Sequence, residues 1–268
     1  MKHHARDLVL VLASYLQAGL LVAWAFHARS LGLGANLSVL LLLLGFAYFN
    51  PIVVTHNFLH TPFFRWRWAN VLFGAHNSMS MGLPTVLYRY HHLAHHRHNN
   101  SLEDPSSTYR YGKAGKQEHW LRYSLLSVFR DGTQKAFLQL VRRGEGALFA
   151  FEALHLFVFW YLLVRIDAAF FGTYYLAYWL LGWCLAHVEN YFEHFHATAP
   201  ASRFGNAVSF YHPLYNALMF NEGYHQEHHI SPQEHWSHRP RTRQQYEAQM
   251  RASGAHQAKF PPLLGMLE

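Results

Sequence analysis

The chain has a single cysteine, Cys184, among its 268 residues. One cysteine excludes an intramolecular disulfide framework, and it excludes zinc or iron–sulfur sites built from several thiolates. Charged residues are also scarce at 14%, whereas 51% of the chain is hydrophobic and 17% is aromatic. This composition is apolar for a soluble protein. The mean hydropathy of -0.07 is nevertheless modest, so a long polar portion must accompany the apolar segments.

Histidine is unusually abundant. The chain has 23 histidines, more than its 22 lysines and arginines together. Packing does not call for so many, because histidine is only an intermediate core residue, and metal ligation is its main alternative use. The formal net charge of +7 favours attraction to anionic lipid headgroups, and we expect no nucleic acid partner.

Four stretches have few or no charges and are long enough to cross a bilayer, which takes about 20 apolar residues. They lie at about residues 8–28, 31–55, 147–165 and 168–187. The connections within the first pair and within the second pair are short, which predicts two helical hairpins. No small-residue cleavage site follows the first stretch, so we expect a retained helix and not a signal peptide.

Basic residues predict the orientation of these helices. Lys2 and Arg6 precede the first span, and the segments 56–146 and 188–268 are rich in lysine and arginine. Positive charge marks the cytoplasmic side, so both termini and both segments are expected there. The prediction is an all-α, multi-pass integral membrane protein, with one domain over residues 1–268. Its four transmembrane helices carry a cytoplasmic helical cap made of 56–146 and 188–268.

Two histidine clusters have the spacing of one helix face. His56 and His60 are four residues apart at the cytoplasmic end of the second predicted span. His225, His228 and His229 follow the pattern i, i+3, i+4. Residues three and four apart are neighbours on a helix surface, so the imidazoles of each cluster can reach one metal.

A third cluster places four imidazoles within six residues: His91, His92, His95 and His96. It fits metal ligation from either of its first two histidines, so His91 and His92 remain alternative ligands. A basic, solvated surface run would be the simpler interpretation of this cluster alone, but four such imidazoles have no packing rationale.

A fourth candidate cluster follows the last predicted span. Asn190 and His194 are four residues apart, and His187 lies two turns before His194 on the same face. Whether His187 or Asn190 acts as a ligand stays open at this point.

The four clusters share a location, because each lies at or just beyond the cytoplasmic end of a predicted membrane helix. Eight or nine imidazoles are more than one metal can use, so the cap is predicted to hold a dimetal site. Imidazole suits iron, copper, nickel and zinc alike. A membrane zinc hydrolase would need fewer histidines, and a transporter would carry ligands near the bilayer centre, where these spans have almost no ionisable groups.

The order and spacing of three clusters resemble the histidine boxes of the membrane fatty acid desaturase and hydroxylase superfamily, over nearly the whole chain. The resemblance implies two Fe ions, O2 as co-substrate and a lipid or fatty acid substrate. It also implies a separate electron-donor protein of ferredoxin, rubredoxin or cytochrome b5 type, because the chain has no Cys-rich rubredoxin-like segment and no haem-binding His-Pro-Gly-Gly motif. The boxes are His56-x3-His60, His92-x2-His95-His96 and His225-x2-His228-His229.

The resemblance also implies the roles of individual residues. Asn190 matches a position that completes a metal shell through water, and Glu193 lies beside the additional ligand His194, so Glu193 and Asn190 are the candidate catalytic residues. We expect the carboxylates within or beside the clusters to balance the metal charge and hold the ligand rings in place: Glu189, Glu193, Glu222 and Glu227. The candidate ligands are His56, His60, His91, His92, His95, His96, His194, His225, His228 and His229.

Two motifs point to different reactions within this superfamily. The segment 190–195 is similar to a motif of alkane ω-hydroxylases, whereas 221–236 resembles bacterial desaturase-like proteins that include fatty acid decarboxylases. Desaturation or hydroxylation of a fatty acyl or alkyl C–H bond is the prediction. Oxidative decarboxylation of a free fatty acid to a terminal alkene is the alternative, and a membrane zinc hydrolase is the remote one.

Overall fold

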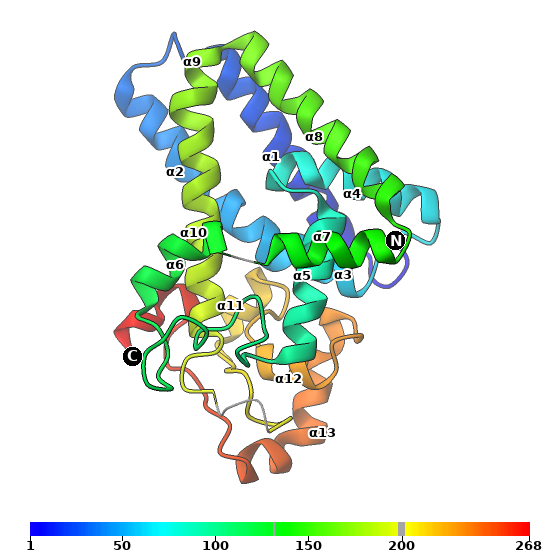
Figure 1. Cartoon of the computed structure of the whole chain (residues 1–268), viewed down its shortest axis with the longest axis vertical. Coiled ribbons are helices and arrows are strands. Elements are labelled where there is room, and N and C mark those ends of the chain that lie inside the picture. The colour runs from blue at the N-terminus through cyan, green and yellow to red at the C-terminus, as the bar shows by residue number, and fades with distance from the viewer. Residues whose placement is uncertain (131, 198–201) are drawn as a thin grey trace. The chain divides into compact units, whose positions relative to one another are not determined.

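The computed structural model describes residues 1–130, 132–197 and 202–268. Within these ranges the chain is helical and has no β-strand, which confirms the all-α class (Figure 1). Three helices in the described ranges are long and apolar enough to cross a membrane: Asp7–His27, Leu33–His60 and Gly146–Ile166. They correspond to the first three predicted spans.

The fourth predicted span, residues 168–187, is helical but not uniform. It comprises α9 (Ala168–Phe170), the π-helix η2 (Phe171–Tyr175) and the first part of α10 (Leu176–Phe192). This segment is not one of the three membrane-compatible helices in the described part of the chain. The arrangement of four spans in two hairpins therefore stays a prediction.

The chain separates into two compact units. The first unit comprises Met1–Tyr90 and Thr133–Trp183, and the second comprises His91–Gly132 and Cys184–Glu268. Helix α5 (Thr85–His98) and helix α10 each begin in the first unit and end in the second.

In the first unit, α1 (Asp7–His27) and α2 (Leu33–Phe49) form a hairpin. The buried side-chain amide of Asn36 stabilises its turn. The side-chain nitrogen of Asn36 donates to the carbonyl of Ala28 at 3.0 Å, and its oxygen accepts from Trp24 Nε1 at 2.8 Å. The bond to Ala28 satisfies a carbonyl group that the end of α1 leaves without a partner. The predicted tight turn between the first two apolar stretches is confirmed.

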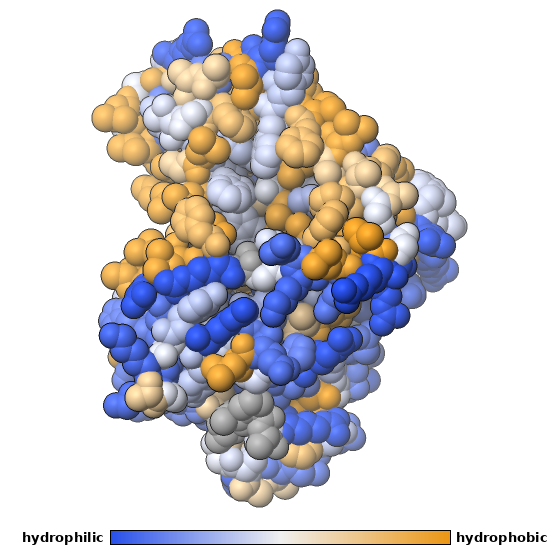
Figure 2. Space-filling model, viewed as in Figure 1, coloured by the Kyte–Doolittle hydropathy of each residue, from blue (hydrophilic) through white to orange (hydrophobic). Residues whose placement is uncertain are grey.

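A second turn of the first unit follows α8 (Gly146–Ile166). Asp167 caps the N-terminus of α9, where its carboxylate accepts from the backbone nitrogens of Ala169 and Phe170 at 2.9 and 3.1 Å. The guanidinium of Arg29 also donates to both carboxylate oxygens, at 2.7 and 2.9 Å. Hydrophobic side chains cover the outer faces of α2 and α8, as a lipid environment requires (Figure 2).

A buried polar network lies inside the first unit, where α4 (Arg67–Met81) packs against α1 and α8. Asn77 accepts from Ser14 at 2.8 Å and from Asn50 at 3.1 Å, and it donates to Thr55 at 2.7 Å. Thr55 in turn donates to Asn50 at 2.7 Å. Asn50 and Thr55 are the ends of the π-helix η1 (Asn50–Thr55), which leads directly into α3 (His56–His60).

The remaining helices are short. In the second unit, Tyr123, Tyr191 and Phe192 form a small buried aromatic core. The first unit also contains α7 (Thr133–Arg142), and the second contains α6 (Trp120–Arg130), α11 (Pro213–Leu218), α12 (His225–Ile230), η3 (Trp236–His238), α13 (Arg239–Ala252) and η4 (Pro262–Leu267).

Candidate metal centre

Four histidines from three distant segments converge in the second unit. His95 lies on α5, His194 follows α10, and His225 and His229 lie on α12. All four are buried, and one nitrogen from each lies within 4.8 Å of the corresponding nitrogens of the others. This arrangement offers four imidazole nitrogens to one metal ion.

The outer nitrogen of each of these rings faces an oxygen. Nδ1 of His95 lies 2.7 Å from a carboxylate oxygen of Asp104, and Nδ1 of His194 lies 3.0 Å from the Asn206 carbonyl. Nδ1 of His229 lies 3.1 Å from the side-chain oxygen of Asn99, and Nδ1 of His225 lies 3.2 Å from Glu193 Oε1. An oxygen acceptor at Nδ1 favours the tautomer with the proton there, which leaves the Nε2 lone pair for a metal.

The distances among the Nε2 atoms fit a bound cation. Nε2 of His194 lies 3.1 Å from that of His95 and 3.4 Å from that of His225. If the protons are on Nδ1, these contacts join lone pairs and would be repulsive. Two imidazoles bound to one metal at about 2.0–2.1 Å bring their nitrogens roughly 3 Å apart. The donor set therefore fits a metal ion better than it fits hydrogen bonds among histidines.

Asp104 is held in place by its own loop. Its carboxylate accepts from the backbone nitrogens of Asn100 at 2.6 Å and Ser106 at 2.7 Å, besides its contact with His95. Burial raises the pKa of this carboxyl, but the neighbouring His95 and these donors outweigh burial and bring the pKa below its ordinary value. Asp104 is therefore ionised at neutral pH and fixes the orientation of the His95 ring.

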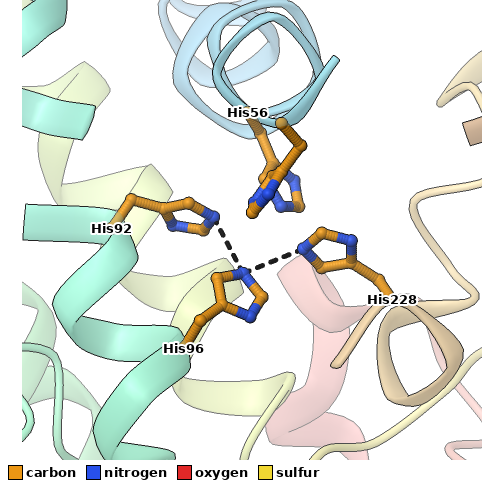
Figure 3. A group of neighbouring side chains, drawn as sticks. His56, His92, His96 and His228 are labelled. Carbon is orange, nitrogen blue, oxygen red and sulfur yellow. Dashed lines mark hydrogen bonds between the residues drawn. The ribbon is translucent and has the colours of Figure 1, made fainter. Parts of the chain in front are cut away.

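A second group in the same unit contains His92 and His96 of α5 and His228 of α12 (Figure 3). Nε2 of His96 lies 3.0 Å from Nε2 of His92 and 2.9 Å from Nε2 of His228, the two contacts drawn dashed in Figure 3. One ring nitrogen carries either a proton or a lone pair, so it cannot make both contacts as ordinary hydrogen bonds. Three lone pairs around one cation account for both distances.

The first unit contributes the histidine pair of α3, and its His56 is also labelled in Figure 3. The ring centroids of His56 and His60 are 5.2 Å apart, and both side chains are buried. Nδ1 of His56 lies 3.1 Å from the carbonyl of Ile52 in the π-helix η1. The Nε2 lone pair of His56 is therefore again the one that can bind a metal. The i, i+4 spacing thus places both rings on one face, as the sequence predicts.

Three further candidates lie outside these groups. His91 and His187 are buried but belong to neither metal-compatible group found among the described residues. Burial lowers the pKa of His91 to about 4. The amide nitrogen of Asn190 donates to the Tyr123 hydroxyl at 2.6 Å and to the Ser106 carbonyl at 3.2 Å. Of the two alternatives in the middle cluster, the structure brings His92 to the other imidazoles.

The second unit also contains buried carboxylates, one of which contacts a ligand histidine. Glu193 faces His225, Glu189 accepts from the Tyr215 hydroxyl at 2.6 Å, and Glu222 pairs with Arg239 at 2.6 Å. Burial and the nearby carboxylates of Glu189 and Glu222 raise the pKa of Glu193 well above its ordinary value. Arg239 offsets the charge of Glu222, and a bound cation would offset the other buried acids.

The protonation of the ligand rings fits the same conclusion. Burial, with the neighbouring His95, lowers the pKa of His194 to about 3. The ring is therefore neutral at physiological pH, which is the form that binds metals.

Of the oxygen acceptors behind the rings, only Glu193 is among the carboxylates expected from the sequence to lie beside the ligands. Asp104 lies nine residues after His95 in a turn-rich segment. An acid so close to a histidine cluster is the one sequence feature that could have indicated this contact. The acceptors at His229 and His194 are an asparagine side chain and a backbone carbonyl, which leave no signal in spacing.

A search of curated proteins and a search of solved structures find no match. The family model described as fatty acid desaturase matches residues 33–261, which include every histidine of the groups above. The chain therefore belongs to the fatty acid desaturase family, and its helices and histidine clusters are those of a desaturase- or hydroxylase-type oxidoreductase that acts on lipid.

Proposed function

We propose that this protein is an O2-dependent diiron oxidoreductase that acts on a C–H bond of a fatty acyl or alkyl chain. The convergence of seven imidazoles in two groups within the second unit carries this proposal. Two bound irons would supply the reduction and activation of O2, while the protein holds the ligands and excludes water.

The proposed ligands divide between the two groups. His95, His194, His225 and His229 hold one iron, and His92, His96 and His228 hold the other. The α3 pair, His56 and His60, supplies further ligands, which its shared helix face and its position as the first histidine box support.

Glu193 and Asp104 are assigned as positioning residues, because each lies against the outer nitrogen of a ligand ring. Asn190 is proposed to reach a metal through water while its amide nitrogen stays bonded to Tyr123. His91 and His187 are assigned no iron.

Desaturation or hydroxylation is the proposed reaction, and oxidative decarboxylation of a free fatty acid is the second candidate. The motif at 190–195 favours the first, and the segment 221–236 favours the second. We further propose four spans, cytoplasmic termini and a cytoplasmic metal centre, with electrons from a separate donor protein.

The test combines metal analysis with product analysis. The full chain is purified in detergent, its metals are counted, and the reduced protein is exposed to O2 with fatty acids, acyl thioesters or alkanes. Near two irons per chain with an O2-dependent alkene, alcohol or shortened 1-alkene supports the proposal and selects the reaction. Stoichiometric zinc without an oxidised product refutes it and favours a hydrolase.

A matched pair of variants ties the metal to the assigned residues. His194→Ala removes a buried ligand and is expected to lower bound iron by about one per chain. His76→Ala removes a histidine that stacks on Tyr15 in the first unit, outside both groups, and should retain all iron. Equal iron in the two variants would contradict the ligand assignment.

A further inference from the structure

A cavity of about 350 Å³ lies within the first unit. Its walls come from α3, the loop that follows it, α4, and the first turns of α5 and α8. This volume falls in the range of small-molecule binding sites. None of the candidate metal ligands lines it, so it is a separate feature of the molecule.

The cavity has an apolar wall. Phe58, Leu59, Val71, Val86 and Leu148 line it, and Val86 is only 2% exposed. Side chains of this kind favour contact with a hydrocarbon chain over water.

The acidic side chains of the cavity already have partners. Glu145 forms an ion pair with Arg89. Glu152 accepts from the backbone nitrogen of Val86 at 2.7 Å and lies 3.4 Å from the Ser78 hydroxyl. Arg89 therefore compensates the charge of Glu145, whereas Glu152 is buried and held by neutral donors.

Besides Arg89, which is paired with Glu145, three basic side chains line the same cavity: Lys2, Arg65 and Arg67. None of them forms an ion pair with any residue in the described ranges. The backbone nitrogen of Lys2 donates to the carbonyl of Phe63 at 2.7 Å, which fixes the N-terminal segment against the loop that carries Arg65. The cavity thus combines an apolar wall with three cations that have no ion-pair partner in the described part of the chain.

The surface beside the cavity indicates where it opens. Arg65, Arg67 and Val71 also border an exposed patch that contains Trp66 and Trp68. The two indoles are 63% and 62% exposed and stack with their centroids 6.0 Å apart. Exposed tryptophans beside arginines are typical of the membrane–water interface, where lipid headgroups lie.

We propose that this cavity binds an anionic amphiphile. Lys2, Arg65 and Arg67 hold the anionic head, and the apolar wall receives the start of the acyl chain. The carboxylate of a free fatty acid and the phosphate of an acidic lysolipid share this chemistry, since both accept charge-assisted hydrogen bonds from arginine. The proposal does not depend on the metal centre, so it can fail or hold without the proposed function.

The test is direct binding to the metal-free full chain in phosphatidylcholine nanodiscs. Brominated oleate and brominated lysophosphatidate quench nearby tryptophans, and the stronger ligand identifies the head group. Brominated lysophosphatidylcholine, which has no net charge, should bind at least ten-fold more weakly. The combined variant Trp66→Phe/Trp68→Phe should lose most of the quenching, and unchanged quenching would place the ligand elsewhere and overturn the proposal.

Matched charge variants test the basic residues. Arg65→Ala/Arg67→Ala should weaken binding by about ten-fold or more, because two charge-assisted contacts are lost. Arg142→Ala/Arg143→Ala removes the same charge from exposed positions outside the cavity and should leave the affinity unchanged. Equal affinities in the two double variants would overturn the proposal.

A third variant tests the cavity if the loss of arginines impairs folding. Leu148→Trp adds bulk to the apolar wall and should also reduce affinity about ten-fold or more while the surface charge stays the same. An unchanged affinity in Leu148→Trp would show that the amphiphile binds at the surface only, against the proposal.

Discussion

Asp104 and His95 form a buried pair in which Oδ2 of the carboxylate lies 2.7 Å from Nδ1 of the imidazole. The carboxylate is itself held by two backbone nitrogens, so it presents a fixed acceptor to the ring of His95. Such outer partners orient metal-bound histidines and raise their basicity. The pair therefore predicts that a residue without metal contact controls metal binding.

Asp104→Asn should weaken metal binding by about 10- to 100-fold, because the amide no longer carries the charge that stabilises the His95 tautomer. Iron per chain after dialysis against a graded chelator measures this change. Glu103→Gln alters the adjacent acid, which is 80% exposed and faces His98, and should bind iron as the unaltered protein does. A parallel loss in both variants would assign the effect to the loop and not to the pair.

Arg29 and Asp167 predict a pH-dependent contribution to stability. The guanidinium of Arg29, together with the backbone donors of α9, lowers the pKa of Asp167 below its ordinary value of 3.8. Above that value both the folded and the unfolded protein have an ionised Asp167, so the stabilisation is fully present. As the pH falls, the unfolded state takes up the proton first, and the stabilisation is lost as the pH passes through the lower folded pKa.

Asp167→Asn should therefore lower the Tm in detergent at pH 7 and have little effect near pH 2. Asparagine is also a good helix N-cap, so the substitution removes mainly the ion pair with Arg29. Glu247→Gln removes the exposed pair with Arg251 and should leave the Tm unchanged at both pH values. A Tm deficit in Asp167→Asn that persists at pH 2 would contradict the assigned role.

Much of the fold could be predicted from the sequence, because long apolar stretches with few charged residues indicate membrane helices. Helices Asp7–His27 and Gly146–Ile166 differ by only a residue or so from the predicted spans 8–28 and 147–165. The second helix differs more, since it continues from Leu33 to His60 beyond the predicted end at Thr55. The extension is α3 (His56–His60), whose histidines end the apolar stretch but continue the helix. The π-helix η1 before it accommodates Pro51 without ending the helix.

For the candidate site, residue spacing predicts only which histidines share a helix face. Helical periodicity identifies which imidazoles share a face, but His91 and His92 both fit that criterion with His95 and His96. The partners behind the rings depend on the path of the loop after α5, where Asn99 and Asn100 adopt positive φ angles of 42° and 63°. Asparagine tolerates this conformation, yet its presence does not reveal which ring the loop will meet.

The buried polar network predicts a stability effect in the first unit. Asn77→Leu removes a residue that bonds Ser14, Asn50 and Thr55, and it leaves their polar groups without that partner. Loss of roughly 1 kcal/mol of unfolding free energy is expected from such interhelical bonds in membrane proteins. Ser38→Ala removes one exposed bond to the carbonyl of Gly34 and serves as the control in unfolding measurements. Equal stability of Asn77→Leu and the unaltered protein would show that the network contributes nothing.

The choice between His91 and His92 gives the last prediction. Nε2 of His92 lies 3.0 Å from that of His96, whereas His91 lies outside both metal-compatible groups in the described residues. His92→Ala should therefore lose iron from the group of His96 and His228, and His91→Ala should keep the full iron content. Both histidines are buried, so comparable folding costs are expected and the metal content is the readout that separates them. Retention of iron in His92→Ala with loss in His91→Ala would reverse the assignment and shift the ligand register of α5 by one residue.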